Sequence, residues 1–221
     1  MSLIKPKTAL ISLSNKSNLE ILVKFLIDKE IKILSTGGTY KAIKEITSEV
    51  VEVSEFTGFE EMMDGRVKTL HPKIHAGILA RRDTDMKALE ERGYEPIDMV
   101  IVNLYPFKET IKNDCSFEEA IEKIDIGGPT MIRAAAKNFN DVTVIVDPND
   151  YQKIIDEWSV NDGITYESRK KLSQKVFAIM ADYNRSISMY FNQEEHNSIH
   201  DYEFEKSIAL RYGENPHQNA S

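Results

Sequence analysis

The chain has 221 residues, of which 41% are hydrophobic and 29% charged, and its formal net charge is −8. This composition is ordinary for a globular protein with one core and little more than one domain. The acidic balance argues against general nucleic-acid binding, and no apolar run reaches the roughly 18 residues that a membrane span needs. The single cysteine, Cys115, excludes an internal disulfide and a cysteine-rich metal site, and it fits a reducing cytoplasm.

The first part of the chain alternates short apolar runs with amphipathic segments. This pattern predicts strands at residues 8–13, 31–35 and 49–53, with helices at 19–28 and 40–46. The sequence Ser-Asn-Leu-Glu at residues 17–20 has the form of a capping box for the first helix. Strands that alternate with helices indicate an α/β fold with a parallel sheet.

A basic segment, residues 64–77 (DGRVKTLHPKIHAG), then interrupts the alternation. In an otherwise acidic protein it carries five basic residues: Arg66, Lys68, His71, Lys73 and His75. Such a patch concentrates a small anion, because arginine offers a planar fork to a phosphate and lysine a movable point charge. Two glycines and a proline interrupt regular structure, so the segment is predicted to be a shaped loop. A solvated loop that offsets nearby acids is an equal alternative on composition alone.

The second part of the chain returns to the α/β pattern. Strands are predicted at residues 99–104 and 142–146. Helices are predicted at residues 84–92, 117–124, 130–138 and 166–191, and a further helix, capped by residues 147–150, reaches Trp158. Ser116 with Glu119 three residues later predicts a capping box at the start of the helix at 117–124. The whole pattern predicts an α/β fold with a parallel sheet and right-handed crossovers.

Polar groups follow several of the predicted strands, at the carboxyl edge where open α/β sheets bind ligands. They are residues 12–16, residues 35–39, residues 103–105 and the basic segment. Residues 35–39 (STGGT) form a strand, a hydroxyl-rich and glycine-rich turn and a helix start, which suits a phosphate. An ordinary capped turn is the alternative. The spacing matches neither a P-loop nor a dinucleotide fingerprint.

A carboxylate precedes a predicted helix start in residues 125–130 (DIGGPT). A helix cap is the simpler interpretation, but Asp125 lies several residues before the predicted first helical position. The two glycines allow a flat ligand to approach the backbone. Lys137 lies two turns along that helix, and a solvated lysine is an equal alternative there. His71 and His75 have metal-compatible spacing, but Pro72 and the lack of an obvious third ligand argue against a metal.

Three segments of the chain have distinctive residue patterns. They are RVKTLHPKIHAG at residues 66–77, NLYPF at 103–107, and IDIGGPT with RAAAKN at 124–138. They resemble the bifunctional purine-biosynthesis enzymes that join an aminoimidazole-carboxamide ribonucleotide (AICAR) transformylase to an inosine monophosphate (IMP) cyclohydrolase. The resemblance is close over residues ~8–160, and motifs of this length are specific.

The resemblance implies the fold and its domain limits. Residues 1–192 are expected to be an IMP cyclohydrolase domain with a methylglyoxal-synthase-like, Rossmann-type three-layer sandwich and C-terminal helices. Residues 210–218 (LRYGENPHQ) resemble the opening of the transformylase portion. Residues 193–221 are therefore expected to be a linker and the start of a truncated transformylase domain.

The resemblance also implies the reaction and the partners. The substrate would be 5-formamidoimidazole-4-carboxamide ribonucleotide, which closes its ring with loss of water to give IMP. No metal and no cofactor is expected for this step, and 10-formyltetrahydrofolate would serve only the missing transformylase domain. The purine nucleotide and IMP are the expected ligands. A cytoplasmic protein with neither nucleic acid nor a membrane as a partner is expected from the composition, and a homodimer is expected because a dimer is the commonest closed assembly.

Site residues follow from the family's motifs, position by position. The phosphate and ribose contacts correspond to Ser12, Ser14, Lys16, Ser35, Thr36, Gly37, Gly38 and Thr39. The base-side and catalytic set corresponds to Arg66, Lys68, Thr69, Asn103, Tyr105, Asp125, Ile126, Gly127 and Lys137. Among these we expect Asp125 to act as the base, Lys68 to stabilise the oxyanion, and Tyr105 and Lys137 to orient groups or relay protons. Asn15 departs from the family, in which an aspartate is common at this position.

Two functions from other classes remain open at the level of the sequence. One is a regulatory module that binds a nucleotide or phosphate, as the same fold does in a carbamoyl-phosphate synthetase. The other is a lyase that acts on a triose phosphate, as in methylglyoxal synthase. A binding module needs the phosphate cradle but not Asp125, Lys68 and Lys137 together, so their joint presence favours the cyclohydrolase.

Overall fold

The computed structural model describes residues 3–105, 107–111 and 115–192. The chain divides into two compact units, Met1–Ile187 and Ser188–Ser221, and only residues 188–192 of the second are described. The sheet and the cavity described below belong to the first unit. The predicted linker and transformylase start, residues 193–221, lie outside the described residues.

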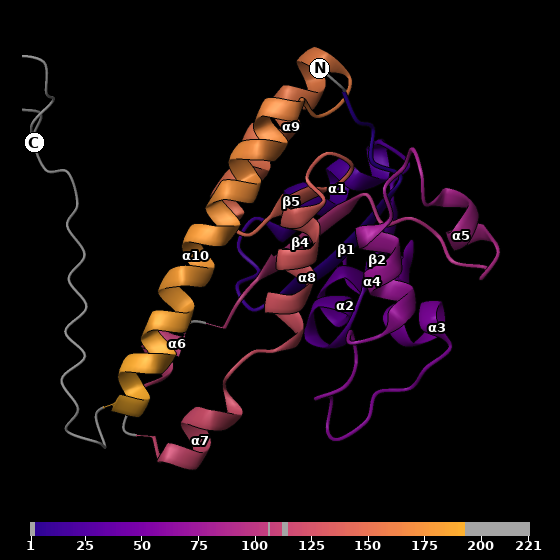
Figure 1. Cartoon of the computed structure of the whole chain (residues 1–221). Coiled ribbons are helices and arrows are strands. Elements are labelled where there is room, and N and C mark those ends of the chain that lie inside the picture. The colour runs from indigo at the N-terminus through magenta and orange to yellow at the C-terminus, as the bar shows by residue number, and fades with distance from the viewer. Residues whose placement is uncertain (1–2, 106, 112–114, 193–221) are drawn as a thin grey trace, which may run out of the picture. The chain divides into compact units, whose positions relative to one another are not determined.

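The core of the first unit is a five-stranded sheet in which all strands are parallel (Figure 1). The strand order is β3-β2-β1-β4-β5. The strands are β1 (Thr8–Leu13), β2 (Lys32–Ser35), β3 (Val50–Glu52), β4 (Met99–Asn103) and β5 (Thr143–Ile145). The predicted α/β fold with a parallel sheet is confirmed, and the strand ends move by only a few residues.

Apolar side chains are aligned across the sheet. Leu34, Leu10, Val100 and Val144 occupy one row in neighbouring strands, and each is 0% exposed. Parallel strands are buried on both faces, which is why they appear in the sequence as continuous apolar runs and not as alternating ones.

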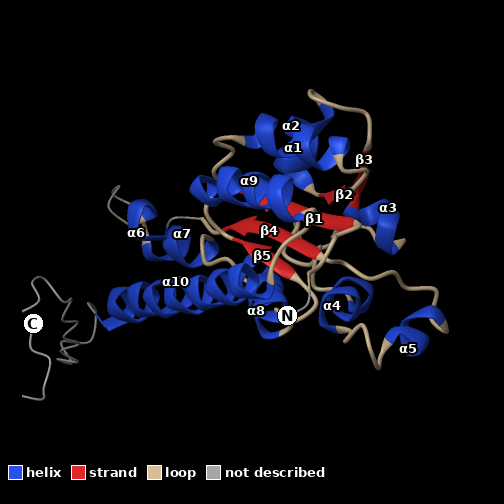
Figure 2. Ribbon diagram, turned by 90° about the horizontal axis from the view of Figure 1, so that it is seen from above, coloured by secondary structure: helices blue, strands red, loops and turns tan. Residues whose placement is uncertain are grey.

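Helices cover both faces of the sheet, as Figure 2 shows, and this confirms the three-layer arrangement. One face carries α1 (Leu19–Asp28), α2 (Gly37–Lys44) and α9 (Tyr151–Asn161). The other carries α4 (Pro72–Leu79), α8 (Gly127–Lys137) and α10 (Tyr166–Asn192). The shorter helices are α3 (Val53–Thr57), α5 (Met86–Glu90), α6 (Phe107–Thr110), α7 (Phe117–Glu122) and the 3₁₀ turn η1 (Pro148–Asp150).

The basic segment is not a loop throughout, and this part of the prediction was wrong. Helix α4 begins inside it at Pro72, with His71 as its N-cap. The Nδ1 atom of His71 accepts the N–H of Lys73 at 3.1 Å. Proline is favourable at the first helical position because its missing N–H would have no partner there, so Pro72 starts this helix and does not break it.

Two other helices begin earlier than predicted, and both starts contain glycine pairs. Helix α2 starts at Gly37 and α8 at Gly127, so residues predicted as turns form the first turns of helices. The capping box predicted at residues 17–20 is absent, because Asn18 is the N-cap in a left-handed conformation without a side-chain cap. The capping box of Ser116 and Glu119 is present.

A buried arginine joins α10 to the end of α8. Arg169 is 0% exposed, and its guanidinium donates to the carbonyls of Phe139 at 2.9 Å and Asn140 at 3.1 Å. One turn later, the hydroxyl of Ser173 donates to the carbonyl of Ala136 at 2.7 Å. The side chains of Arg169 and Ser173 thus donate hydrogen bonds to carbonyls in residues 136–140, which the end of a helix leaves unpaired. Within the residues that the structure describes, no helix is both long and apolar enough to cross a membrane.

We predict that Arg169→Ala lowers the free energy of unfolding by about 3 kcal/mol, because buried carbonyls lose a charged donor and a large side chain leaves a cavity. Urea denaturation measures this change. Lys170→Ala is the matched control, since Lys170 is exposed on the same helix and its loss should cost less than about 0.5 kcal/mol. Equal stability of the two variants would contradict the anchoring role.

Candidate functional site

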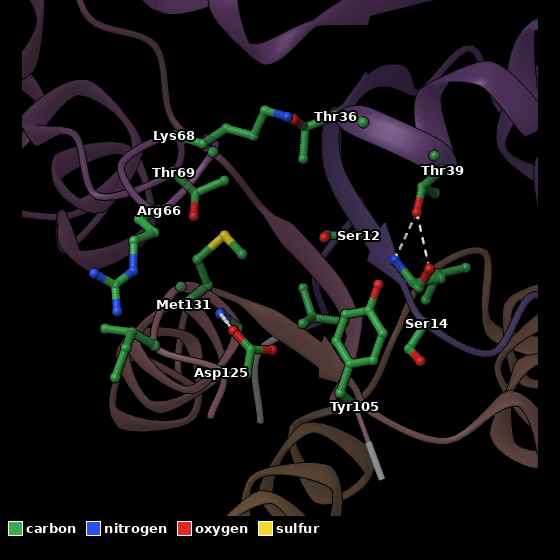
Figure 3. Close-up of a pocket in the computed structure, with 18 of the residues that line it drawn as sticks. Ser12, Ser14, Thr36, Thr39, Arg66, Lys68, Thr69, Tyr105, Asp125 and Met131 are labelled. Atoms are coloured by element: carbon green, nitrogen blue, oxygen red, sulfur yellow. Dashed lines mark hydrogen bonds between the residues drawn. The ribbon is translucent and has the colours of Figure 1, made fainter. Parts of the chain in front are cut away.

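The strand order creates a topological switch between β1 and β4. From β1 the chain moves outward to β2 and β3, and it then crosses to β4 on the other side of β1. Ligands of open parallel sheets bind at the carboxyl edge beside such a switch. A cavity of about 550 Å³ lies there, bounded by the segments that follow β1, β2 and β4, by the basic segment and by the start of α8 (Figure 3).

The structure brings most of the predicted site residues to this cavity. Its lining includes Ser12, Ser14, Lys16, Thr36, Gly37, Gly38, Thr39, Arg66, Lys68, Thr69, Asn103, Tyr105, Asp125, Ile126 and Gly127. Ser35 and Lys137 do not line it. Ser35 is fully buried, and its hydroxyl donates to the carbonyl of Ile11 at 2.9 Å, which ties β2 to β1. Lys137 is exposed at the last residue of α8, about 15 Å along the helix axis from Gly127.

The start of α2 forms an anion cradle at one side of the cavity. Gly37 has a φ of +56°, a conformation that favours glycine, and the chain turns there from β2 into the helix. The first N–H groups of the helix have no partner within it, and the helix dipole favours a negative charge beside them. Thr36 is 7% exposed, and its Oγ1 atom is one of the buried side-chain atoms without a hydrogen-bond partner among the described residues.

Two ammonium groups lie beside this cradle. The Nζ atom of Lys68 is 3.5 Å from the position that a Cβ atom on Gly37 would occupy, and that of Lys16 is 3.9 Å from the equivalent point on Gly38. In Figure 3, Lys68 extends toward Thr36. Lys68 also forms an ion pair with Glu61. In this conformation the ammonium of Lys68 therefore lies on the α2 side of the cavity.

Lys68 and Arg66 belong to a short hairpin that is closed by an antiparallel bridge between Met62 and Val67. The Nη2 atom of Arg66 is 3.1 Å from Oε1 of Glu122, so the hairpin is linked to α7. Both side chains of this pair are mostly exposed, and such a pair contributes little stability.

Two predicted binding residues have side chains that are engaged by the backbone of the loop after β1. Asn103 accepts the N–H groups of Ser14 at 2.7 Å and Asn15 at 2.9 Å, and its amide donates to the carbonyl of Asn15 at 2.8 Å. Thr39 accepts the N–H of Leu13 at 2.8 Å and donates to its carbonyl at 3.1 Å. These two side chains hold the end of β1 and the loop that carries Ser14.

Asp125 lies on the opposite side of the cavity, just before α8. The N-cap of α8 is Ile126, so Asp125 lies before the cap position, as predicted. Because α8 begins at Gly127 and not at Thr130, the Oδ1 atom of Asp125 still reaches the first turn and accepts the N–H of Gly128 at 2.9 Å. Burial raises the pKa of Asp125, and the hydrogen bond from Gly128 partly opposes that increase. A carboxylate with a raised pKa is a better proton acceptor than an exposed one.

The glycine pair allows the start of α8 to approach this carboxylate closely. A Cβ atom on Gly128 would lie 2.5 Å from Oδ2 of Asp125, and one on Gly127 would lie 2.8 Å from Oγ1 of Thr69. Both distances are shorter than any van der Waals contact. Thr69 is 6% exposed, so the basic segment and α8 meet at a contact where only glycine fits.

The middle of the cavity combines a phenol with apolar side chains. Tyr105 is 56% exposed, and in Figure 3 its hydroxyl points toward Ser12. Ile126 and Met131 line the cavity as apolar groups beside Asp125. The cavity thus has an anion cradle at one side, a carboxylate at the other and partly apolar surface between them, an arrangement that suits a phosphorylated ring compound.

Sequence reasoning did not assign ten residues that line the cavity: Leu13, Asp64, Gly65, Val102, Ile121, Glu122, Lys123, Ile124, Gly128 and Met131. Gly128 lies within the motif that pointed to Asp125, and Met131 follows Gly127 by one helical turn, so both had a signal in the sequence. Ile124 is the first residue of the motif IDIGGPT, but residues 121–123 had no signal, because only the tertiary fold brings the end of α7 to the cavity. His71, whose spacing from His75 is compatible with a metal site, is the N-cap of α4.

Two family models match the sequence in adjacent stretches. The model described as the MGS-like domain matches residues 18–130, which is more than half of the chain. The model described as the AICARFT/IMPCHase bienzyme matches residues 135–221.

Curated relatives and a solved structure agree with these models. Proteins described as "Bifunctional purine biosynthesis protein PurH" are 53% identical in Clostridium botulinum (strain Langeland) and 54% identical in Clostridium acetobutylicum, each over 97% of this chain. The chain spans 44% of the length of these relatives. The structure described as "Crystal structure of ForH" is 32% identical, with a TM-score of 0.73, and the match covers 85% of this chain and 100% of that one. The chain therefore belongs to the family of MGS-like domains, and the part that follows this domain matches the family of AICARFT/IMPCHase bienzymes.

Proposed function

We propose that this chain is an IMP cyclohydrolase, which closes the ring of 5-formamidoimidazole-4-carboxamide ribonucleotide with loss of water. The observation that carries the proposal is the presence, in one cavity, of an anion cradle at α2 and of Asp125 with a raised pKa. The names of the purine-biosynthesis relatives support the same reaction. A regulatory module would need the cradle but no half-buried carboxylate across from it.

In this proposal the nucleotide spans the cavity from α2 to α8. The 5′-phosphate binds the first N–H groups of α2, Thr36 Oγ1 and the ammonium of Lys16. The ribose lies near Ser12 and Ser14, and the imidazole ring lies between Tyr105 and the apolar side chain of Ile126. The carboxamide and formamide groups then face Asp125.

The ring closure needs a proton acceptor and a group that stabilises negative charge. Asp125 removes a proton from the carboxamide nitrogen as this nitrogen attacks the formyl carbon. The formyl oxygen becomes an oxyanion and takes up the proton that left the carboxamide nitrogen, which gives a hydroxyl group. The hydroxyl then leaves as water with the hydrogen of the formamide nitrogen, and the C–O bond is replaced by the C=N bond of the new ring. Lys68 is proposed to stabilise that oxyanion, which requires its ammonium to leave Glu61 and turn from the cradle on its flexible stem. Tyr105 orients the reacting groups or relays protons. Lys137 was assigned with Tyr105 from the resemblance alone, and the cavity of this chain gives that assignment no support.

The wider setting is also a proposal. Residues 1–192 would form the cyclohydrolase domain of a cytoplasmic, homodimeric protein, and residues 193–221 would lead into a transformylase domain. The cyclohydrolase step is proposed to use no cofactor. A transformylase portion would take 10-formyltetrahydrofolate and AICAR.

We predict that the purified chain forms IMP from the formylated nucleotide but not from AICAR with 10-formyltetrahydrofolate. The residues proposed for ring closure lie in one compact unit with its own core, whereas only the start of a transformylase sequence is present. Product formation is followed by absorbance and confirmed by mass spectrometry. Release of methylglyoxal from dihydroxyacetone phosphate, with no IMP, would favour the triose-phosphate lyase. Nucleotide binding without turnover would favour the regulatory module.

We predict that Lys68→Ala and Asp125→Asn each lower kcat by about a hundredfold, the usual effect of losing an oxyanion or proton-transfer group. Steady-state kinetics with the formylated nucleotide measures this change, and circular dichroism verifies folding. Lys170→Ala, exposed and distant from the cavity, is the control. A higher KM with unchanged kcat for Lys68→Ala would make Lys68 a phosphate contact only.

We also predict that Asp125→Asn stabilises the protein at neutral pH. Because the folded-state pKa of Asp125 lies above 3.8, the folded protein still holds this proton over a pH range in which the unfolded chain has released it. Stability therefore falls as pH rises from 3.8 through the folded-state pKa, and the asparagine variant escapes that loss. Chemical denaturation should show a greater free energy of unfolding for the variant at pH 7, with a difference that shrinks toward pH 4. If the variant is no more stable than the wild type at pH 7, the folded protein does not disfavour the charged form of Asp125.

A further inference from the structure

We propose that Tyr183, on helix α10, is a positioning residue for Asp125, an inference that rests on the proposed function. The backbone N–H of Asp125 donates to the hydroxyl oxygen of Tyr183 at 2.8 Å. The two residues are 58 positions apart, and Tyr183 is 8% exposed. Tyr183 does not line the cavity, so any effect that it has on the reaction is indirect.

The segment between α7 and α8 needs such support. Among the residues that the structure describes, one hydrogen bond holds the carboxylate of Asp125, from the N–H of Gly128 at 2.9 Å, and the glycine backbone approaches it closely. That bond fixes one oxygen atom but not the backbone on the other side of the residue. The hydrogen bond to Tyr183 fixes that backbone, and a half-buried N–H without it would carry the cost of an unpaired donor.

Tyr183 also contacts the segment that carries Tyr105. Phe107 is 1% exposed and packs edge-on against the ring of Tyr183, with ring centroids 6.3 Å apart and an interplanar angle of 69°. Next to this contact, Nζ of Lys108 is 2.5 Å from Oδ1 of Asp182. One turn of α10 thus supports both catalytic segments, the one after β4 and the one before α8.

The chemistry of the phenol suits a structural and not an acid–base role. Burial raises the pKa of Tyr183, so the hydroxyl stays protonated throughout the pH range of an assay. The hydrogen bond and the ring contact of Tyr183 lie at Asp125 and Phe107, whereas the anion cradle is formed by Thr36, the start of α2 and the ammonium groups beside it. Loss of the hydroxyl should therefore affect the geometry of Asp125 and leave phosphate binding intact.

The test compares Tyr183→Phe with Tyr166→Phe in the full chain. Both variants lose one hydroxyl from the same helix, and the two positions are about 25 Å apart along its axis. Steady-state kinetics with the formylated nucleotide should show kcat about tenfold lower for Tyr183→Phe, with KM within about twofold of the wild type, because misplacing a catalytic group costs rate more than binding. Tyr166→Phe should match the wild type in both constants.

A double-mutant cycle separates positioning from a general structural effect. In the Asp125→Asn background, Tyr183→Phe should cause no further loss of kcat, because the group that it positions is already gone. Amide hydrogen exchange provides a readout independent of turnover, and the N–H of Asp125 should exchange faster in Tyr183→Phe but not in Tyr166→Phe.

The outcomes that overturn the inference are distinct from failure of the proposed function. An active wild type with normal kcat in Tyr183→Phe would refute the positioning role. An equal loss of kcat in the wild-type and Asp125→Asn backgrounds would also refute it. A wild type that forms no IMP would instead refute the cyclohydrolase proposal on which the inference rests.

Discussion

All five strands of the sheet run in the same direction, and the location of the candidate site depends on this constraint. A parallel sheet places the ends of β1, β2 and β4 at one edge, so residues from distant parts of the sequence meet there without long loops. The same constraint places helices on both faces, since each parallel connection must cross from one end of the sheet to the other. The polar side chains at the edge are therefore carried by a rigid and fully buried core.

Within that frame the cavity joins two sides with different electrostatic character. At α2, helix N–H groups and two lysines produce a positive field. At α8, burial holds a carboxylate in an environment that disfavours its charge. Such an environment reduces stability but makes the carboxylate a stronger proton acceptor, which is how functional sites differ from the rest of a structure. Glu61 meanwhile keeps the charge of Lys68 paired within the protein.

The sequence allowed much of the fold to be predicted because its signals are local. Buried parallel strands are continuous apolar runs, and the capping box at Ser116 is read from two residues. Helix starts were predicted less well, since Pro72 can either end a helix or begin one, and only the fold decides which. The residues of the candidate site could be named from motifs, but the direction of Lys68 could not, because its ion pair with Glu61 depends on the hairpin. The contact between Tyr183 and Asp125 has no local signal at all.

The contacts of α10 have a consequence for how the protein forms during translation. Arg169 and Tyr183 bind backbone groups that are synthesised well before them, at residues 139–140 and at Asp125. The hydrogen bond at Asp125 spans 58 positions, which takes roughly 3–12 s at typical rates of synthesis. All five strands are made before α10, so a nascent chain can assemble its sheet while the Asp125 segment still lacks its support. The ribosome must therefore finish α10 before the candidate site can reach its final geometry.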